Sequence, residues 1–189
     1  FRSMVSLRRL CLAVGLLMSM PLLAASPAYQ PLVDDLARVA PTLDPVVLTH
    51  AVAAMQCAVN HGATPAKRLA VIDFSLPSSE RRLWIFDLQR GRLLLKDFVA
   101  HGNGSGENLA TRFSNVEGSH QSSIGLFRTA ESYSGKHGYS LRMDGLEPGV
   151  NDLARERAIV IHPADYVNPA WIATQGRIGR SQDRKSTRL

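Results

Sequence analysis

Cysteine is scarce in this sequence, which contains only Cys11 and Cys57. Cys11 lies in an apolar N-terminal run that we expect to be removed as a signal peptide. Its removal would leave one thiol and therefore excludes an intramolecular disulfide. Cys57 lies among small apolar residues of a predicted helix, where a buried free thiol is common. We expect a structural role for Cys57, and a catalytic role is the alternative.

Signatures of several enzyme classes are missing as well. The chain has no Gly-x-Ser-x-Gly and no Ser-x-x-Lys, the signatures of serine hydrolases and penicillin-binding proteins. No HxH or HExxH motif is present, so a metal site would require the fold to gather the histidines at 101, 120, 137 and 162. The run HGNGSGE, residues 101–107, lacks the Lys-Ser/Thr pair of a phosphate-binding loop, and we interpret it as a flexible loop.

The formal net charge of +6 does not indicate a nucleic-acid-binding protein. Much of this charge comes from basic residues at the two ends of the chain: Arg2, Arg8, Arg9, Arg184, Lys185 and Arg188. A nucleic-acid footprint requires a basic face clustered on the folded domain. We therefore expect no nucleic-acid partner.

Residues 1–28 are predicted to form a signal peptide. Arg8 and Arg9 precede the short apolar run LCLAVGLLM, and alanines from residue 24 onward provide cleavage positions. The run is too short for an ordinary membrane span, although an uncleaved anchor is the alternative. We expect an exported protein of the periplasm or cell envelope, with no membrane segment after cleavage.

The body of the chain is predicted to begin with helices and to continue as strands. In residues 29–66, apolar residues recur at helical spacing. Asp44 and Pro45 match the first positions of a helix, and Gly62 matches a helix exit. In residues 67–182, apolar runs separated by turn residues predict strands. The predicted class is α+β overall and mainly β.

Six runs are strand candidates: LAVIDFS, RLWIFDL, RLLLKDFVA, IGLFRTAES, YSLRMD and RAIVIH. Gln89-Arg90-Gly91 predicts a hairpin between the second and the third. A polar loop over residues 101–123 separates the third from the fourth. A loop of this length in a compact domain is usually functional.

His162 stands at the end of the last of these runs. Residues 158–161 are continuously apolar, as in a buried central strand, and Pro163 ends the run. A histidine at such an edge can be half-buried and neutral, which suits a general base. The alternative is a histidine that caps the strand by a hydrogen bond to a loop carbonyl.

Two segments carry a resemblance to a known family: SSIGLFRTAESYSGKHGYSLRMDGLEPGVNDLARERAIVIHPADYV and GRIGRSQ. Their order resembles that of the murein L,D-transpeptidase catalytic domain of the YkuD type, over residues 69–182. The resemblance implies a sandwich-like, mainly β catalytic domain with helices packed beside it. It also implies peptidoglycan stem peptides as partners and no metal or organic cofactor.

The resemblance assigns roles to individual residues. His162 matches the general base, and Ser181 matches the residue that helps to position the turn bearing the nucleophilic cysteine. His137 and Tyr139 are the candidates for the substrate cleft. In this family a thiolate attacks the third residue of a donor stem and expels D-alanine, and an amine of a second stem then completes the cross-link. The imidazole takes the proton of the thiol, and backbone N–H groups of the turn bind the oxyanion.

One departure from the family pattern affects activity directly. The family has Gly-Cys where this sequence has Asp183-Arg184, and Pro163 stands where glycine is common. We expect the tail 183–189, DRKSTRL, to be non-native and the chain as written to lack transpeptidase activity. Cys57 lies outside the matching segments and is not expected to replace the nucleophile. The alternatives are a non-catalytic exported module that binds peptidoglycan, and an unrelated exported β-rich binding protein.

Overall fold

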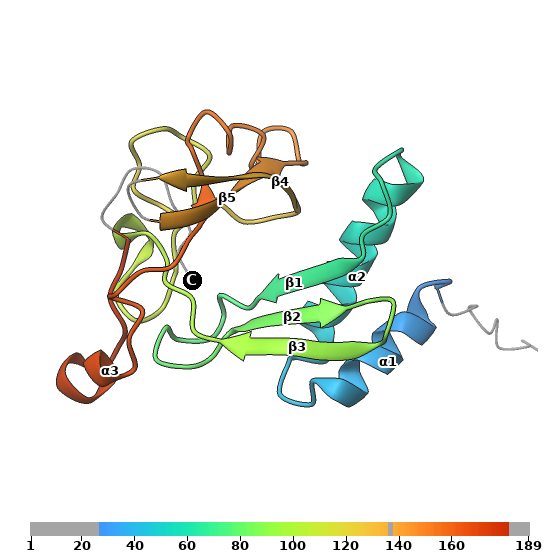
Figure 1. Cartoon of the computed structure of the whole chain (residues 1–189), viewed down its shortest axis with the longest axis horizontal. Coiled ribbons are helices and arrows are strands. Elements are labelled where there is room, and N and C mark those ends of the chain that lie inside the picture. Colours follow the sequence, from blue (N-terminus) through green and yellow to red (C-terminus); the bar gives the residue numbers. More distant parts are fainter. Residues whose placement is uncertain (1–26, 136–137, 182–189) are drawn as a thin grey trace, which may run out of the picture.

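The structure, a computed structural model, describes residues 27–135 and 138–181 (Figure 1). It contains two three-stranded antiparallel sheets, ordered β1-β2-β3 and β4-β5-β6. The elements are α1 (Gln30–Val39), α2 (Pro45–Asn60), β1 (Arg68–Ile72), β2 (Leu83–Asp87), β3 (Arg92–Asp97), η1 (Asn103–Ser105), β4 (Phe127–Gly135), β5 (Gly138–Gly145), β6 (Val160–Ile161) and α3 (Ala170–Gln175). The predicted α+β class, mainly β, is confirmed.

The first two helices form where the sequence predicted them. Asp44 is the N-cap of α2, and its side chain accepts hydrogen bonds from the backbone N–H groups of Val46 at 2.7 Å and Val47 at 3.4 Å. Pro45 occupies the first helical position, where its missing N–H costs nothing. The chain leaves the helix through Gly62, whose φ of 95° lies in the left-handed region.

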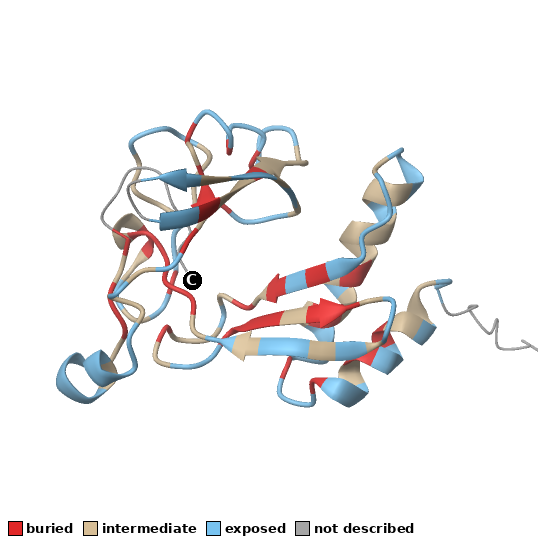
Figure 2. Cartoon of the chain, in the orientation of Figure 1, coloured by how far each residue is buried: buried red, intermediate tan, exposed pale blue. Residues whose placement is uncertain are grey.

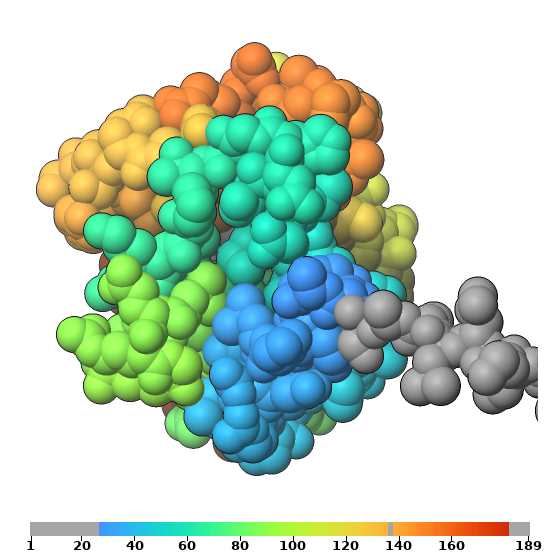
Figure 3. All heavy atoms as spheres, turned by 90° about the vertical axis from the view of Figure 1, so that its right-hand side faces the viewer, coloured from blue at the N-terminus to red at the C-terminus, as the bar shows by residue number. Residues whose placement is uncertain are grey.

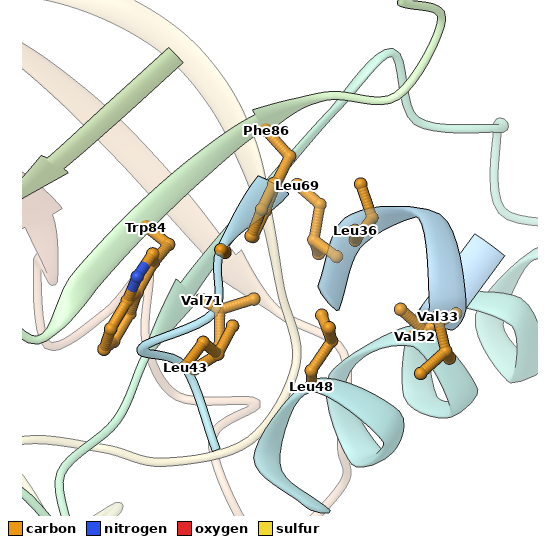
Figure 4. Close-up of a cluster of buried hydrophobic side chains, with 10 residues drawn as sticks. Val33, Leu36, Leu43, Leu48, Val52, Leu69, Val71, Trp84 and Phe86 are labelled. Atoms are coloured by element: carbon orange, nitrogen blue, oxygen red, sulfur yellow. The ribbon is translucent and has the colours of Figure 1, made fainter. Parts of the chain in front are cut away.

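The helices cover the first sheet and share a core with it. Residues of α1, α2, β1 and β2 and of the connection between the two helices form this cluster (Figure 4): Val33, Leu36, Ala40, Leu43, Leu48, Val52, Leu69, Val71, Trp84 and Phe86. Figure 3 shows the face on which the two helices lie. Full burial of a side chain such as Phe86 contributes roughly 1.5–3 kcal/mol, so this cluster is the main apolar anchor of the fold. The hairpin predicted at Gln89-Arg90-Gly91 joins β2 to β3.

The second sheet has a smaller core of its own. Met143, Ala154 and Ile159 are buried there, with Phe127 and Ile161 packed against them. The run before His162 was predicted to be a buried central strand. Its burial is confirmed at Ile159 and Val160, but the predicted central position is wrong. β6 has two residues and lies at the edge of the sheet, where it pairs with β5 through Leu141–Ile161 and Arg142–Val160.

Buried residues also occur outside the two cores. Figure 2 shows buried residues along β1 and β2, which contribute to the first core, and further ones in the chain between β3 and η1. The run 101–107 was predicted to be a flexible loop. That prediction is wrong in its physical content, because His101, Gly102 and Ser105 are buried and hydrogen-bonded to neighbouring segments. This polar interior links the two sheets and carries the residues considered next.

Other predictions concern the two ends of the described chain. Residues 1–26 of the predicted signal peptide and residues 182–189 at the other end lie outside the described residues. No helix in the described ranges is long and apolar enough to cross a membrane. The expected burial of Cys57 is wrong, because its side chain is exposed on α2. The residues of α2 that are buried against the core are Leu48 and Val52.

Candidate active site

His162 follows β6 directly and is buried, with 2% of its surface exposed. The sequence predicted a half-buried ring. Its Nδ1 lies 2.7 Å from the backbone oxygen of Pro163, and a carbonyl can only accept, so Nδ1 donates. In the neutral ring the lone pair therefore resides on Nε2, which is also buried. The contact predicted for a strand cap thus also fixes the tautomer that a general base requires.

Ser181 is fully buried and lies beside the start of the 101–107 loop. Its N–H donates to the backbone oxygen of His101 at 3.0 Å, and its own carbonyl accepts from the N–H of Asn103 at 3.0 Å. These bonds make a parallel bridge between Ser181 and Gly102. In Figure 1 the red end of the described chain accordingly lies beside the yellow-green segment around η1. The position of Ser181 is therefore set by main-chain pairing.

The segment that follows His162 approaches the same place from the other side. Gly179, two residues before Ser181, donates its N–H to the backbone oxygen of Tyr166 at 2.8 Å. A Cβ on Gly179 would lie 2.5 Å from the Cβ of Tyr166, so only glycine permits this approach. The 177–181 segment is thus held between the loop after His162 and the loop that contains Gly102.

Charged contacts reinforce this arrangement. Glu107 pairs with two arginines of the 177–181 segment, at 3.2 Å from Arg177 and 2.7 Å from Arg180. Arg180 also donates to the backbone oxygen of Gly106 at 2.9 Å. The Glu107 side chain is 72% exposed, so each pair contributes little stability alone, on the order of 0–1 kcal/mol. Their effect is to fix the register of the segment on the loop.

His101, the first residue of this loop, forms a buried pair with Arg82, and neither residue has exposed surface. A guanidinium nitrogen of Arg82 donates to His101 Nδ1 at 2.7 Å, and His101 Nε2 donates to the backbone oxygen of Gly106 at 3.2 Å. Burial and the neighbouring Arg82 charge lower the pKa of His101 to about 4. Burial also lowers the pKa of Arg82 to about 10, against the opposing effect of the Asp73 charge. Arg82 is therefore charged and His101 neutral at neutral pH.

The His101 pKa leads to a testable pH dependence of stability. The folded-state pKa of about 4 lies below the ordinary histidine pKa of 6.5, so the unfolded chain binds more protons between these values. The stabilisation is complete above about pH 6.5 and is lost as the pH falls toward 4, with a limiting slope of about 1.4 kcal/mol per pH unit. We expect His101→Gln to flatten this part of the curve, measured by urea unfolding at a series of pH values. An unchanged slope would contradict the shift.

A third segment closes the other side of the 101–107 loop. Gly104 donates its N–H to the backbone oxygen of His120 at 2.9 Å, and Gly102 donates its N–H to the hydroxyl of Ser122 at 3.0 Å. A Cβ on Gly102 would overlap the His120 carbonyl. His120 itself adopts a left-handed φ of 54°, which a histidine adopts more easily than most residues. The glycines of HGNGSGE therefore serve close backbone packing.

Arg157, in the turns before β6, holds this third segment in place. Its guanidinium is buried and donates to the backbone oxygens of Ser114 and Gln121 and to the hydroxyls of Ser119 and Ser123. All four acceptors are neutral, and burial lowers the pKa of Arg157. Arg157 thus ties the polar segment before β4 to the chain that leads to His162.

The remaining predicted site residues are placed as follows. Tyr139 is 68% exposed, and the register of β5 with β6 puts it at the end of the sheet where His162 follows. His137 lies outside the described residues. In the described part of the chain, no three His, Cys, Asp or Glu side chains gather as they would around a metal ion. The Sγ atom of Cys57 lies 3.7 Å from Nδ1 of His61, the C-cap residue of α2. The imidazole next to this thiol is therefore that of His61.

Sequence reasoning missed Arg82, His101 and Arg157 as parts of this site. One signal was available for His101, which opens the Gly-rich run that the structure shows to be closely packed. The two arginines gave no local signal, because their partners lie 6 to 43 residues away along the chain. Hydrogen-bond partners that are distant along the chain can be identified only from the folded structure.

Comparison with known proteins identifies the family of this chain. A family model described as the L,D-transpeptidase catalytic domain matches residues 39–183, well over half of the chain. No curated protein and no solved structure gave a match. The matched range includes both sheets, His162 and the 177–181 segment. Proteins of this family act on peptidoglycan stem peptides in cross-linking. The chain belongs to the L,D-transpeptidase catalytic domain family.

Proposed function

We propose that this site is built for cysteine-dependent acyl transfer between peptidoglycan stem peptides, with His162 as the general base. The observation that carries the proposal is the hydrogen bond from His162 Nδ1 to the carbonyl of Pro163. It leaves Nε2 as the nitrogen that takes a proton from a neighbouring nucleophile. A histidine fixed in this tautomer at the end of a strand fits the role of base that the family resemblance implies.

The chemistry divides into two steps. In the first, Nε2 of His162 takes the thiol proton, the thiolate attacks the carbonyl of the third stem residue, and D-alanine leaves with a proton as the acyl-enzyme forms. In the second, the amine of an acceptor stem attacks this thioester, loses a proton, and releases the thiol and the cross-linked product. His162 serves as base in each attack and returns the proton in each collapse. Backbone N–H groups of the nucleophile's turn would bind the oxyanion.

Ser181 is assigned a positioning role in this proposal. Its backbone is paired on both sides, to His101 and to Asn103, and it directly precedes the positions at which the family carries its nucleophilic turn. Main-chain pairing up to Ser181 therefore fixes the point from which that turn would start. Tyr139, and His137 by the resemblance alone, are proposed contacts for the stem peptide.

The sequence as given provides no thiol for this chemistry. Its cysteines are Cys11 and Cys57, and Cys57 is exposed on α2, outside the strands that carry the site. We expect the purified chain to bind a stem tetrapeptide and to leave it uncleaved. Mass spectrometry of a donor-acceptor mixture checks the outcome, and release of D-alanine or formation of a cross-linked dimer would contradict it. NMR titration of the His162 ring signals by the same peptide checks the binding.

The lack of a suitably placed thiol in the given sequence supports a second candidate function, a non-catalytic peptidoglycan-binding module of the cell envelope. Both candidates act on a substrate outside the cytoplasmic membrane, which agrees with the signal peptide proposed for residues 1–28. N-terminal sequencing of the secreted protein tests that signal, and a retained residue 1 would contradict it. The two functions separate when a thiol is placed after Gln182. The enzyme then forms an acyl adduct, whereas a binding module does not.

A further inference from the structure

We propose that Arg82 and His101 form a positioning pair that sets where the 177–181 segment lies relative to His162. The part of this inference that concerns catalysis rests on the proposed function above, whereas the part that concerns the placement of the segment does not. Neither residue contacts the reacting atoms in the proposed chemistry. Their role is to hold the backbone on which Ser181 pairs.

The first step of the argument is that the loop acts as a template. The amide and carbonyl of Ser181 bond to the backbone of His101 and Asn103, and Arg180 bonds to Gly106 and Glu107. These contacts all lie within residues 101–107. The placement of the segment on this side is therefore only as well defined as that loop.

The second step is that the His101 side chain closes the loop on itself. Its Nε2 donates to the carbonyl of Gly106, five residues further along the chain, at 3.2 Å. Its Nδ1 accepts from Arg82 at 2.7 Å. One neutral imidazole thus fixes both ends of the short loop and connects it to the chain before β2.

The third step is that Arg82 connects the loop to the first sheet. Its Nε and one terminal nitrogen donate to the carbonyl of Val99, at 3.2 and 3.0 Å, and another terminal nitrogen donates to Leu76 at 2.8 Å. The guanidinium also lies 5.1 Å from the ring centre of Phe74. Arg82 directly precedes β2, whose Trp84 and Phe86 are fully buried in the main core. The orientation of the loop is thereby fixed relative to the main apolar core.

The hydrogen-bonding geometry of Arg82 gives a physical reason for this pair. Arg82 is buried with no carboxylate among its hydrogen-bond partners in the described chain, and a buried charge carries a large desolvation cost. Its hydrogen bonds to neutral acceptors offset part of that cost, and their loss would leave those buried acceptors unsatisfied. The planar fork of an arginine supplies several donors in one fixed geometry. That geometry specifies the direction of the loop, which an apolar contact does not.

Amide hydrogen exchange of the full 189-residue chain tests the proposal without any substrate. We expect His101→Ala to accelerate exchange of the Asn103 and Ser181 amides by about tenfold or more. The amides of β1 and β2 are expected to keep their protection within about threefold. His101→Gln carries an acceptor and a donor on one amide and is expected to restore most of the protection at both sites.

The contrary results are distinct. Equal acceleration throughout the chain would show that His101 contributes only to global stability, and unchanged exchange at Ser181 would show that the loop is held without it. If His101→Ala does not fold, Arg82→Lys decides the matter. It keeps the charge and loses the fork, so we expect the same local acceleration at Ser181, and wild-type protection would overturn the proposal.

Failure of this inference and failure of the proposed function give different results. Local loosening at Ser181 supports the positioning pair even if no thiol placed after Gln182 is ever acylated. Conversely, acylation of such a thiol with wild-type exchange in His101→Ala would support the function and overturn the pair. In the thiol-bearing chain, His101→Ala is expected to slow acylation with little change in donor affinity.

Discussion

The double substitution D183G/R184C is expected to give the chain an acylatable thiol. It creates the Ser-x-Gly-Cys order directly after the paired segment that ends at Ser181. Incubation with a stem tetrapeptide donor should then produce a covalent adduct of the chain and release D-alanine. We expect a gain of at least about a thousandfold in acylation rate over the parent chain, because loss of the nucleophile alone costs about as much as loss of the whole catalytic set. Intact-protein mass spectrometry measures both adduct and rate.

Three further variants decide which residues act in that reaction. His162→Gln in the double variant should slow acylation by about a hundredfold to ten-thousandfold, because the thiol loses its base. Cys57→Ser should leave the rate unchanged, because Cys57 is exposed on α2. D183G/R184S controls for the altered backbone and should form no adduct. An adduct that requires Cys57, or one that forms equally well without His162, would contradict the assigned site.

The sequence correctly predicted that the candidate base, His162, stands at the end of a strand, for reasons that are local. The apolar run before His162 and the proline after it place a histidine at a strand end, and the structure shows β6 ending there. The same pattern misjudged the strand's place in the sheet. A continuously apolar run indicates burial, and here the burial comes from the small cluster of Met143, Ala154 and Ile159 at a sheet edge. Burial and centrality are different properties, and the sequence reports only the first.

The loop 101–107 shows more clearly what the amino-acid composition of a segment does not predict. The run was interpreted as a flexible loop, as expected of glycine, which has the widest range of backbone conformations. In the structure Gly102 and Gly104 permit close contact with residues 119–122. Composition does not separate these two uses of glycine, since the difference depends on a segment more than ten residues away. The buried arginines could not be predicted either, because their partners are distant along the chain. Arginine is also ordinarily an exposed residue.

Cys57 was misplaced by a different cause. Small apolar neighbours suggested a buried thiol, but the buried residues of α2 are confined to Leu48 and Val52 near its start. The later turns extend beyond the sheet that the helix covers (Figure 1). Helical periodicity predicts which residues share a face. It does not predict how far along the helix that face has a partner.

Arg157→Leu is expected to destabilise the fold by more than about 3 kcal/mol and to lower the melting temperature by roughly 10 °C. Leucine fills part of the volume but donates no hydrogen bond. The carbonyls of Ser114 and Gln121 and the hydroxyl of Ser123 would each lose a donor. Each buried acceptor left unsatisfied costs on the order of 1–3 kcal/mol. Thermal and urea unfolding of the purified variant measure the loss.

Arg128→Leu provides the matched control. Arg128 makes an ion pair with Asp144 at 3.2 Å, and its side chain is 60% exposed, so the same substitution there should cost less than about 1 kcal/mol. A similar loss in both variants would mean that charge removal dominates and that the buried acceptors around Arg157 are satisfied in another way. A loss confined to Arg157→Leu, with faster amide exchange at Gly104 and Ser122, would locate the cost in the polar segment beside the 101–107 loop. Since that segment forms one wall of the template for Ser181, the stability of this interior and the geometry of the site would then have a common origin.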